Sequence, residues 1–426
     1  MREGGRIAAA IDVLGDIAGR SQPASEALRE WGRTHRFAGA GDRAAIGNLV
    51  YDALRRREEI VWRMGADDPR ALAIGAAALW RTEAQLDFAF SDDEHAPDPL
   101  SEAERAALAK DLEDAPDTVR ANLPDWLVPS FRNMFGDDWA AEGAALSHRP
   151  PLDLRINALV SDRDKAWKAL ARLHPQPPAV SPGAIRFPAG AAASRTPNIA
   201  SEMPYLKGWV EVQDEGSQCA ALMTGAEPGH QVLDYCAGAG GKTLALAGAM
   251  ANKGQVFAYD SDRSRLAPIH ERLRRARTRN VQVREPGEEM SELKGRMDRV
   301  LVDAPCTGSG VWRRHPDAKW RLTEQALQRR VAEQDEVLRE AAPFVKPGGE
   351  LVYVTCSLLP EENMDAVGVF LSAHPDFARV PLMPRWTSLF GEDVPRPMEV
   401  EGGALVLTPR RTGTDGFFVC ALKKAG

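Results

Sequence analysis

The feature that most constrains the fold of this chain is an alternation of short apolar runs with helical patterns, which begins near Val210 and continues toward the C-terminus. Short apolar runs bounded by turn residues are typical of buried strands, whereas apolar residues three or four apart indicate helices. Strands that alternate with helices predict a parallel, doubly wound α/β sheet. The predicted strands are Gln231–Cys236, Gln255–Tyr259, Val281–Val283, Arg299–Val302, Leu351–Val354 and Gly416–Leu422, and the predicted helices are Leu244–Met250, Ser264–Thr278 and Glu324–Val345.

The N-terminal part of the chain has a different pattern, in which helical spacing is interrupted by short polar breaks. Arg43–Arg57 carries one apolar stripe, and Ala71–Trp80 is a second helical segment. Ser101 and Glu104 have the spacing of a capping box, which predicts the start of a further helix. We therefore expect an all-α module that binds or scaffolds, because no catalytic combination of residues is present there.

Two boundaries divide the rest of the chain. Pro150-Pro151 ends the helical part, and the next residues alternate like a strand before a helical pattern and several Pro- and Gly-rich turns. We predict an all-α domain over 1–145, a small α+β domain over 146–210 and an α/β domain over 211–426. Within the last, the Pro-, Gly- and Arg-rich residues 378–414 predict a long loop or hairpin.

The composition is that of a globular protein, with 44% hydrophobic and 27% charged residues. No apolar run is long enough to span a bilayer, and the N-terminal helical pattern does not resemble a signal peptide, so we expect a cytoplasmic protein without membrane contact. The five cysteines do not suggest a disulfide framework or a metal site.

The net charge of −7 does not by itself predict a nucleic-acid-binding protein. Local clusters of charged residues are more informative. Five arginines between Arg272 and Arg279 are most simply a solvated helix face. A second cluster lies shortly after Cys306, near the predicted ligand crevice, and there we favour contact with phosphates. That second cluster consists of Arg313, Arg314, Lys319 and Arg321.

A glycine loop follows the first predicted strand of the α/β domain, in Asp234–Thr243. Its glycines, at 238, 240 and 241, allow a tight turn and a close approach to a ligand. The spacing is not that of a phosphate-binding P-loop. Asp260, at the end of the next strand, is placed to bind ribose hydroxyls. Alone, this arrangement fits NAD, a nucleotide or S-adenosylmethionine equally well.

Two cysteines end two separate apolar strands, Cys306 after Arg299–Val302 and Cys356 after Leu351–Val354. Residues at the carboxyl ends of parallel strands line the ligand crevice, so two thiols there suggest covalent chemistry. Taken alone, a buried structural thiol is the simpler interpretation of a strand cysteine. That interpretation is kept for the other three, Cys219, Cys236 and Cys420.

Several segments, in the same order, resemble motifs of the RNA 5-methylcytosine methyltransferases (the RsmB/NOL/NSUN family). Asp303–Gly310 with Arg313–Asp317 is similar to motif IV, Tyr353–Ser357 with Pro360–Asn363 to motif VI, and Asp234–Thr243 to motif I. Two further segments, Val212–Gln218 and Asp415–Phe418, are similar to other conserved segments of the family. The resemblance covers residues 150–426, and the helical N-terminus resembles less closely the NusB-like domain of the RsmB branch.

The resemblance implies a Rossmann-like class I methyltransferase domain with a mostly parallel, seven-stranded sheet. A small α+β, RRM-like RNA-binding unit and an all-α NusB-like domain precede it. It assigns attack on C6 of cytosine to Cys356 and resolution of the adduct to Cys306. Asp303 would contact N3 and the exocyclic amine of the base, and Lys242 would lie near both base and cofactor. The implied cofactor is S-adenosylmethionine, and the residues expected to bind it are Cys236, Ala237, Gly238, Ala239, Gly240, Gly241, Lys242, Asp260 and Asp303.

One departure from the family pattern concerns the acidic residue that follows the third strand and reads the adenine amino group. The chain has Val283–Glu289 there without the usual Asp, and Glu285 and Glu288 are both candidates for that role. Motif I also carries Gly238-Ala239 where many members have Ala-Pro.

The expected substrate is ribosomal RNA, with tRNA as the alternative, and the expected state is a monomer. A second hypothesis is a non-catalytic RNA-binding or ribosome-assembly factor on the same fold, although such a factor would be expected to lack Asp303, Cys306 or Cys356. A third is an amino-methyltransferase, which ranks last because Asp303-Ala304-Pro305-Cys306 stands where those enzymes have Asn/Asp-Pro-Pro-aromatic.

Overall fold

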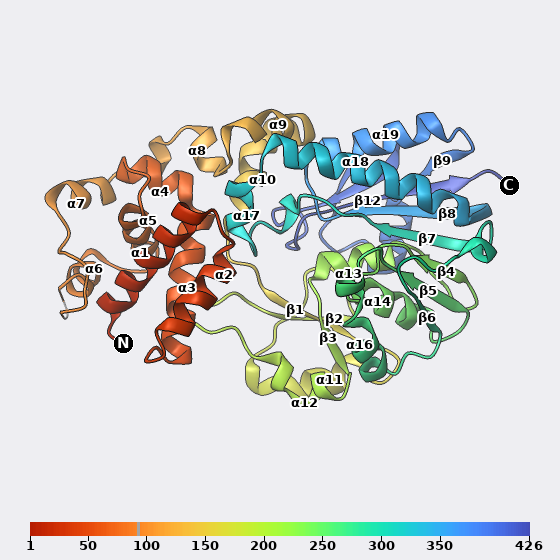
Figure 1. Ribbon diagram of the computed structural model, residues 1–426, viewed down its shortest axis with the longest axis horizontal. Coiled ribbons are helices and arrows are strands. Elements are labelled where there is room, and N and C mark those ends of the chain that lie inside the picture. The colour runs from red at the N-terminus through yellow and green to blue at the C-terminus, as the bar shows by residue number, and fades with distance from the viewer. Residues whose placement is uncertain (92–93) are drawn as a thin grey trace. The chain divides into compact units, whose positions relative to one another are not determined.

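The computed structural model describes residues 1–91 and 94–426 (Figure 1). Contacts divide them into two units, each of which is described by itself. The first comprises Met1–Pro150, Ala189–Thr196 and Trp312–Leu322, and the second Pro151–Pro188, Pro197–Val311 and Thr323–Gly426. The three-domain division expected from the sequence stays a prediction.

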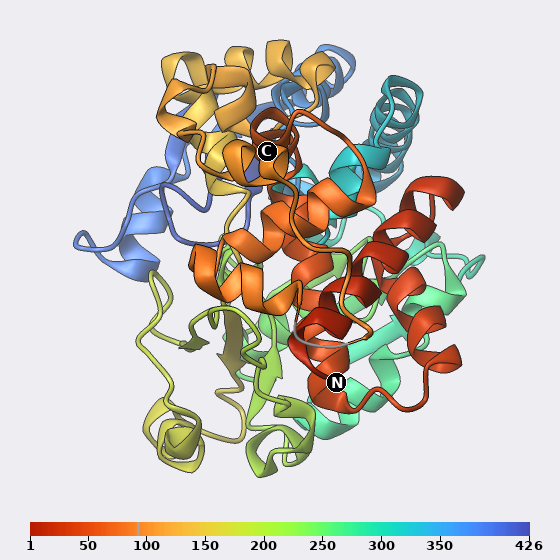
Figure 2. The ribbon, with the colours of Figure 1, turned by 90° about the vertical axis from the view of Figure 1, so that its left-hand side faces the viewer.

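The first unit is helical, and its long helices pack around one apolar core (Figure 2). Its helices are α1 (Glu3–Arg20), α2 (Ala24–Thr34), α3 (Ala40–Arg55), α4 (Arg57–Met64), α5 (Pro69–Ala78), α6 (Glu83–Ala89), α7 (Glu102–Leu108), α8 (Asp117–Ala121), α9 (Val128–Phe135), α10 (Trp139–Ala145) and α17 (Pro316–Arg321). The predicted capping box is confirmed at the start of α7. The Ser101 hydroxyl accepts the Glu104 N–H at 3.2 Å, and the Glu104 carboxylate accepts the Ser101 N–H at 2.8 Å.

Part of the first unit comes from much later in the sequence. Trp312, 1% exposed, stacks on Phe131 with ring centroids 6.3 Å apart, and the Trp320 indole N–H donates to the carbonyl of Leu54 at 2.6 Å. The chain thus leaves the second unit shortly after Cys306, completes the core of the first with Trp312–Leu322, and then returns.

The second unit begins with a small antiparallel sheet in the order β2-β1-β3. Its elements are β1 (Leu152–Ile156), α11 (Arg163–Leu170), β2 (Ala184–Phe187), α12 (Met203–Leu206) and β3 (Val210–Val212). Leu154 and Ile185 point toward α11 and form an apolar core with Ala166 and Leu170. Residues of the opposite parity, such as Asp153 and Arg155, therefore occupy the other face of the sheet.

The rest of the second unit is the predicted α/β fold. Its elements are α13 (Glu215–Leu222), β4 (Gln231–Asp234), α14 (Gly241–Ala249), β5 (Gln255–Tyr259), α15 (Arg263–Leu266), α16 (Ile269–Ala276), β6 (Val281–Arg284), β7 (Met297–Asp303), α18 (Glu324–Ala341), β8 (Val345–Thr355), α19 (Met364–Ala373), β9 (Phe377–Val380), α20 (Met383–Phe390), β10 (Met398–Val400), β11 (Ala404–Leu407) and β12 (Phe417–Lys424).

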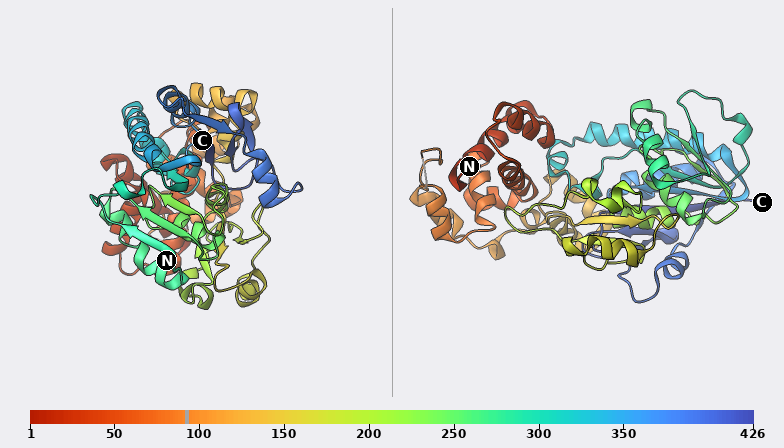
Figure 3. Two further views of the ribbon diagram at one scale, coloured as in Figure 1. Left: turned by 90° about the vertical axis from the view of Figure 1, so that its right-hand side faces the viewer. Right: turned by 90° about the horizontal axis from the view of Figure 1, so that it is seen from below.

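Strands β6, β5, β4, β7 and β8 are parallel neighbours in that order, and β12 adds antiparallel to β8. Helices α13, α14 and α16 cover one face of this sheet and α18 and α19 the other (Figures 1 and 3). The strand order reverses between β4 and β7. In doubly wound sheets, the crevice at the carboxyl ends of such strands is where ligands bind.

The C-terminal part of this unit differs from the expectation in two respects. In the described residues the sheet has nine strands instead of seven: the six from β6 to β12 lie in the order given above, and β9, β10 and β11 extend it beyond β12. Residues 378–414 are also more than a loop or hairpin. They contain α20, which buries Trp386 and Phe390 in the core, as well as the hairpin of β10 and β11.

Candidate active site

The carboxyl ends of β4, β5, β7 and β8 bring the predicted site residues to one edge of the sheet. Asp303 is the last residue of β7 and is paired in register with Val354 of β8. The two cysteines follow three residues after Asp303 and two residues after Val354, so the strand register itself brings them together.

The two thiols are in direct contact. The Sγ atoms of Cys306 and Cys356 lie 3.3 Å apart, and both residues are half-buried and free of disulfide bonds. The hydrogen bond with Cys356, together with burial, raises the pKa of the Cys306 thiol well above its ordinary value. Cys306 therefore keeps its proton when it lies beside Cys356.

Lys242 and Asp303 form an ion pair next to the thiols. Lys242, in the first turn of α14, is 8% exposed, and its Nζ donates to Oδ2 of Asp303 at 2.7 Å. Burial alone would lower the pKa of Lys242, but the Asp303 carboxylate raises it, so the ammonium group stays charged. Nζ also lies 5.2 Å from the centre of the Phe417 ring.

The glycine loop connects β4 to α14 and is closed by Asp260. Oδ2 of Asp260 accepts the N–H of Gly238 at 2.9 Å, and Asp260 is 2% exposed. Gly240 has φ of +81°, and a Cβ there would lie 2.5 Å from Cγ1 of Ile269, so only glycine fits. The loop thereby holds residues 236–241, the expected cofactor-binding residues, against the ends of β4 and β5.

The residues around this loop suit a cationic cofactor such as S-adenosylmethionine. Asp234, fully buried at the end of β4, accepts a hydrogen bond from Thr243 at 2.6 Å through Oδ2. Its Oδ1 has no hydrogen-bond partner among the described residues, and burial raises its pKa to about 7. A ligand ammonium would satisfy this acceptor. Asp234 is not among the site residues that the sequence predicts, although an acid at a strand end before a glycine loop is a recognisable signal.

The two candidates for the adenine-reading acid differ in their contacts. Arg284 and the N–H of Glu285 both donate to the Glu288 carboxylate, and the hydrogen bond from Arg284 lowers the pKa of Glu288. The Glu285 side chain is 48% exposed and lies 3.5 Å from Arg263. Glu288, 37% exposed, is therefore held by two donors at hydrogen-bond distance, whereas Glu285 is more exposed and its contacts, with Arg263 and His270, are longer.

The second arginine-rich cluster does not lie as expected. Lys319 is 1% exposed and donates to the carbonyl of Asn122 at 2.5 Å, and Arg313 is 4% exposed. Arg321 pairs with Asp317 at 2.8 Å. The expectation that this cluster contacts phosphates is wrong for Arg313 and Lys319, because both are buried within the helical unit.

The first cluster is also more than a solvated helix face. Arg272 and Arg275 both contact the Glu211 carboxylate, at 3.1 and 2.6 Å, and Arg272 donates in addition to the carbonyl of Ala239 in the glycine loop at 2.8 Å. Arg274, Arg277 and Arg279 are exposed, as expected.

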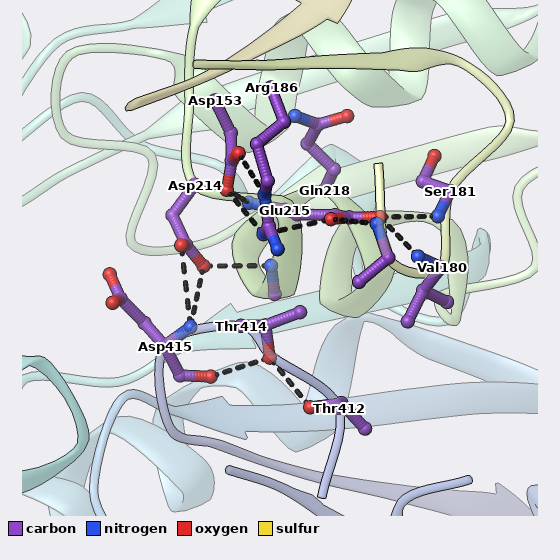
Figure 4. Close-up of polar contacts among 12 residues, drawn as sticks. Asp153, Val180, Ser181, Arg186, Asp214, Glu215, Gln218, Thr412, Thr414 and Asp415 are labelled. Atoms are coloured by element: carbon purple, nitrogen blue, oxygen red, sulfur yellow. Dashed lines mark hydrogen bonds and ion pairs between the residues drawn. The ribbon is translucent and has the colours of Figure 1, made fainter. Parts of the chain in front are cut away.

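Two further segments with family resemblance, Val212–Gln218 and Asp415–Phe418, meet where the Asp214 carboxylate faces the backbone of Asp415 (Figure 4). The carboxylate of Asp214 accepts the N–H of Asp415 at 3.2 Å, the N–H of Gly416 donates to the carbonyl of Gly310 at 2.8 Å, and the N–H of Gly310 donates to the carbonyl of Cys356 at 2.9 Å. A Cβ on Gly310 would lie 2.2 Å from the Gly416 carbonyl oxygen. This packed turn therefore supports the backbone of Cys356.

A buried ion cluster anchors the same segment to the small sheet (Figure 4). Arg186 contacts Asp153 at 2.7 Å and Glu215 at 2.9 Å, and both carboxylate side chains are fully buried. Glu215 also accepts the backbone N–H groups of residues 179–181. This face of the small sheet is thus covered by the part of the unit that contains the large sheet.

The described residues contain no group of three or more His, Cys, Asp or Glu side chains arranged to hold a metal ion. No helix in residues 1–91 and 94–426 is both long enough and apolar enough to cross a membrane.

Comparison with known proteins gives consistent matches. Residues 221–423 match the family model "16S rRNA methyltransferase RsmB/F", and residues 123–191 match the RsmF/B-like ferredoxin-like domain. "Probable ribosomal RNA small subunit methyltransferase B" of Synechocystis is 33% identical over 71% of the chain and 67% of the relative. "Ribosomal RNA small subunit methyltransferase B" of Cronobacter sakazakii is 36% identical over 59% of the chain.

The chain spans about three fifths of the length of several such relatives, for example 58% of the Cronobacter protein. The solved structure of a protein described as PH0851 has a TM-score of 0.72 and 25% identity, and the match covers 100% of this chain and 99% of that one. The expected fold class is confirmed by this similarity.

Proposed function

Because the chain belongs to the RsmB/F family of rRNA methyltransferases, we propose that it is an S-adenosylmethionine-dependent enzyme that methylates C5 of a cytosine in RNA. The observation that carries the proposal is the contact between two thiols 3.3 Å apart, beside the Lys242–Asp303 ion pair and the glycine loop. Covalent methylation of a pyrimidine needs a nucleophile that adds to the ring and a base that helps to resolve the adduct, and two adjacent thiols can serve as these two groups.

Cys356 is the proposed nucleophile. C5 of cytosine is a poor nucleophile, and addition of the Cys356 sulfur to C6 moves the electron pair of the C5–C6 double bond onto C5 and the conjugated ring. C5 can then form a bond to a methyl group. The bound cofactor supplies this methyl group on a positively charged sulfonium sulfur. Loss of the C5 proton restores the double bond, and the Cys356 sulfur leaves as a thiolate.

Cys306 is the proposed resolving residue, and its environment supports a sequence in which the Cys356 thiol reacts first and the Cys306 thiol second. Its pKa is raised by the hydrogen bond with Cys356 and by burial, so it holds its proton while Cys356 attacks. Once the Cys356 sulfur is bonded to C6, that sulfur is an uncharged thioether. The largest cause of the raised pKa is then removed, so Cys306 can release its own proton to solvent and, as a thiolate, accept the C5 proton.

Asp303 and Lys242 are proposed to hold the base. Asp303 lies at the end of β7 with a side chain 30% exposed, so its carboxyl group is accessible to N3 and the exocyclic amine of a base. Lys242 orients this carboxyl group through the 2.7 Å ion pair. Residues 236–241 and Asp260 are proposed to bind the cofactor, with Asp234 accepting its ammonium group.

Ribosomal RNA is the proposed substrate, because the similar proteins carry that substrate in their names. A tRNA is the alternative substrate. A non-catalytic RNA-binding or assembly factor is the alternative function, but the presence of Cys306, Cys356 and Asp303 in one cluster argues against it.

The RNA contact that we propose for the small α+β part uses its helical face. The opposite sheet face carries Asp153, Arg155 and Glu211, all buried, so RNA has no access to it. On the helical side, the ammonium groups of Lys165 and Lys207 lie 4.2 and 5.4 Å from the Trp209 ring. Exposed cations beside aromatic rings are typical of surfaces that bind single-stranded RNA.

Trapping of the covalent adduct tests the proposed roles of the two cysteines. Cys306→Ala, incubated with rRNA and S-adenosylmethionine, is expected to give an RNA–protein adduct that survives denaturing electrophoresis, whereas Cys356→Ala gives none. Adduct formation by Cys356→Ala would show that the assignment is wrong.

Bisulfite sequencing of RNA from cells with and without the gene then identifies the cytosine. Absence of any change in rRNA and tRNA would favour the non-catalytic factor.

A further inference from the structure

The carboxylate of Glu362 is fully buried between the two cysteine-bearing loops, and the chemistry proposed above gives it no part. Glu362 ends the short helical turn Pro360–Glu362 that follows β8. Both of its carboxylate oxygens are used, and together they accept four hydrogen bonds from the described residues.

The loop of Cys306 is held on both sides of the cysteine. Thr307 donates its backbone N–H to Oε1 of Glu362 at 2.7 Å, and its hydroxyl donates to Oε2. Gln334 of α18 donates to Oε1 of Glu362 at 3.0 Å and to the carbonyl of Pro305 at 2.8 Å. The residues immediately before and after Cys306 are therefore tied, directly or through Gln334, to one carboxylate.

The end of β8 is held in the same way around Cys356. The Ser357 hydroxyl donates to Oε2 of Glu362. The neighbouring Asn363 accepts the Thr355 hydroxyl at 2.6 Å through Oδ1 and donates through Nδ2 to the Ser357 carbonyl at 2.9 Å. Glu362 and Asn363 thus fix the residues before and after Cys356.

We infer that Glu362 is a positioning residue that sets the contact between the sulfur atoms of Cys306 and Cys356. A carboxylate accepts hydrogen bonds on both oxygens and donates none, and it is the group that matches four converging donors. Charge-assisted hydrogen bonds in a buried site are strong and directional, so they hold both loops at once. The inference rests on the proposed function for its catalytic consequence, but the contact between the thiols can be measured without catalysis.

The first test uses a trivalent arsenical, phenylarsine oxide, which bridges two neighbouring thiols. The full-length wild-type protein is expected to bind one equivalent across Cys306 and Cys356, and Cys306→Ala and Cys356→Ala are expected to lose it. Glu362→Ala is expected to weaken this binding about tenfold or more, because it leaves buried donors unsatisfied. Glu362→Gln keeps the shape, and the two hydroxyls can turn to accept from its amide, so it is expected to restore most of the affinity.

The matched control is Glu350→Gln. Glu350 is also a buried carboxylate, 8% exposed, but it lies in the middle of β8, six residues before Cys356, and pairs with Arg385 at 2.7 Å. It is expected to leave arsenical binding unchanged even where it lowers the melting temperature. The inference would be overturned if Glu362→Ala bound the arsenical as tightly as the wild type. It would also be overturned if Glu350→Gln lost as much affinity as Glu362→Ala. If Glu362→Ala does not fold, Thr307→Val and Ser357→Ala each remove one donor and are expected to weaken binding by a smaller factor.

The second test measures release of the RNA adduct. If Glu362 acts by placing Cys306, then Glu362→Ala slows release, and adding it to Cys306→Ala slows release no further. Additive slowing would overturn the inference, because it would indicate a general structural defect. If neither the wild type nor any variant forms an adduct or transfers a methyl group, the proposed function is wrong. Arsenical binding still tests whether Glu362 positions the two thiols.

Discussion

Lys242 and Asp303 lie 61 residues apart in the sequence and form an ion pair of 2.7 Å at the carboxyl edge of the large sheet. The pair joins the start of α14 to the end of β7, on the two sides of the point where the strand order reverses. It therefore links the cofactor loop to the residues proposed to hold the base, and it is the contact on which the first prediction depends.

Removal of either partner is expected to slow methyl transfer much more than it weakens cofactor binding. Asp303→Asn and Lys242→Met should each lower the single-turnover rate by about 100-fold or more. The double variant should be little worse than either single one, because the two residues act as a unit. Rapid-quench assays with radiolabelled cofactor measure the rates. A wild-type rate in Asp303→Asn would exclude a role for its charge.

Cofactor affinity is expected to depend on Asp260 and on Glu285. Asp260→Asn should weaken binding of S-adenosylhomocysteine about tenfold, because a carboxylate that accepts hydrogen bonds is lost. Glu285→Gln should weaken it as well, whereas Glu288→Gln should not, since Arg284 already occupies Glu288. Isothermal titration calorimetry measures these affinities. The control variant is Asp262→Asn, which changes an exposed carboxylate. If Glu288→Gln alone weakens cofactor binding, then Glu288 and not Glu285 is the acid that reads the adenine amino group.

The lysines beside Trp209 are expected to contribute to RNA affinity through phosphates. Neutralising both, in Lys165→Gln/Lys207→Gln, should reduce the slope of log K against log salt by roughly 1.4, which corresponds to two lost contacts with a single strand. Filter binding at several salt concentrations measures the slope. The control is Lys253→Gln/Lys294→Gln, which neutralises two exposed lysines at the amino edge of the sheet. Equal slopes for the wild type and both double variants would show that Lys165 and Lys207 do not contact RNA phosphates.

Lys319 is expected to make the stability of the helical unit rise with pH. Burial lowers the pKa of Lys319 to about 7, from an unfolded value near 10.5, despite opposing effects of Glu58 and Glu59. Below pH 7 the folded state carries a buried charge. As the pH rises from 7 toward 10.5, the unfolded chain binds more protons than the folded one, so the unfolding free energy increases.

Comparison with Lys319→Met isolates this effect, because all other titrating groups are shared. The unfolding free energy of the wild type relative to that of the variant is expected to rise by up to about 1.4 kcal/mol per pH unit above pH 7. Below pH 6 the difference should be constant. Urea titrations between pH 6 and 9.5 measure it, and a difference independent of pH would mean that Lys319 stays charged when folded.

Local patterns in the sequence predicted those parts of the fold that depend on neighbouring residues. The strand Gln255–Tyr259 has the predicted ends, and Ser101 caps α7 as predicted. These features depend on side-chain spacing and on hydrogen bonds within one turn, which a single sequence contains in full. The prediction for segment 378–414 is wrong because its Pro, Gly and Arg content favours a loop, whereas the burial of Trp386 and Phe390 in α20 depends on residues distant in the chain.

The order of strands and helices, the glycine loop and the two strand-end cysteines can be read from the sequence, and so can the family resemblance, which is now confirmed. Three features became visible only in three dimensions: Glu362 joins both cysteine loops, Asp234 has a buried oxygen without a partner among the described residues, and Lys319 lies within the helical unit. Burial and hydrogen-bond partners are set by residues tens to hundreds of positions away. A carboxylate or an ammonium group has the same appearance in the sequence whether solvent or protein surrounds it.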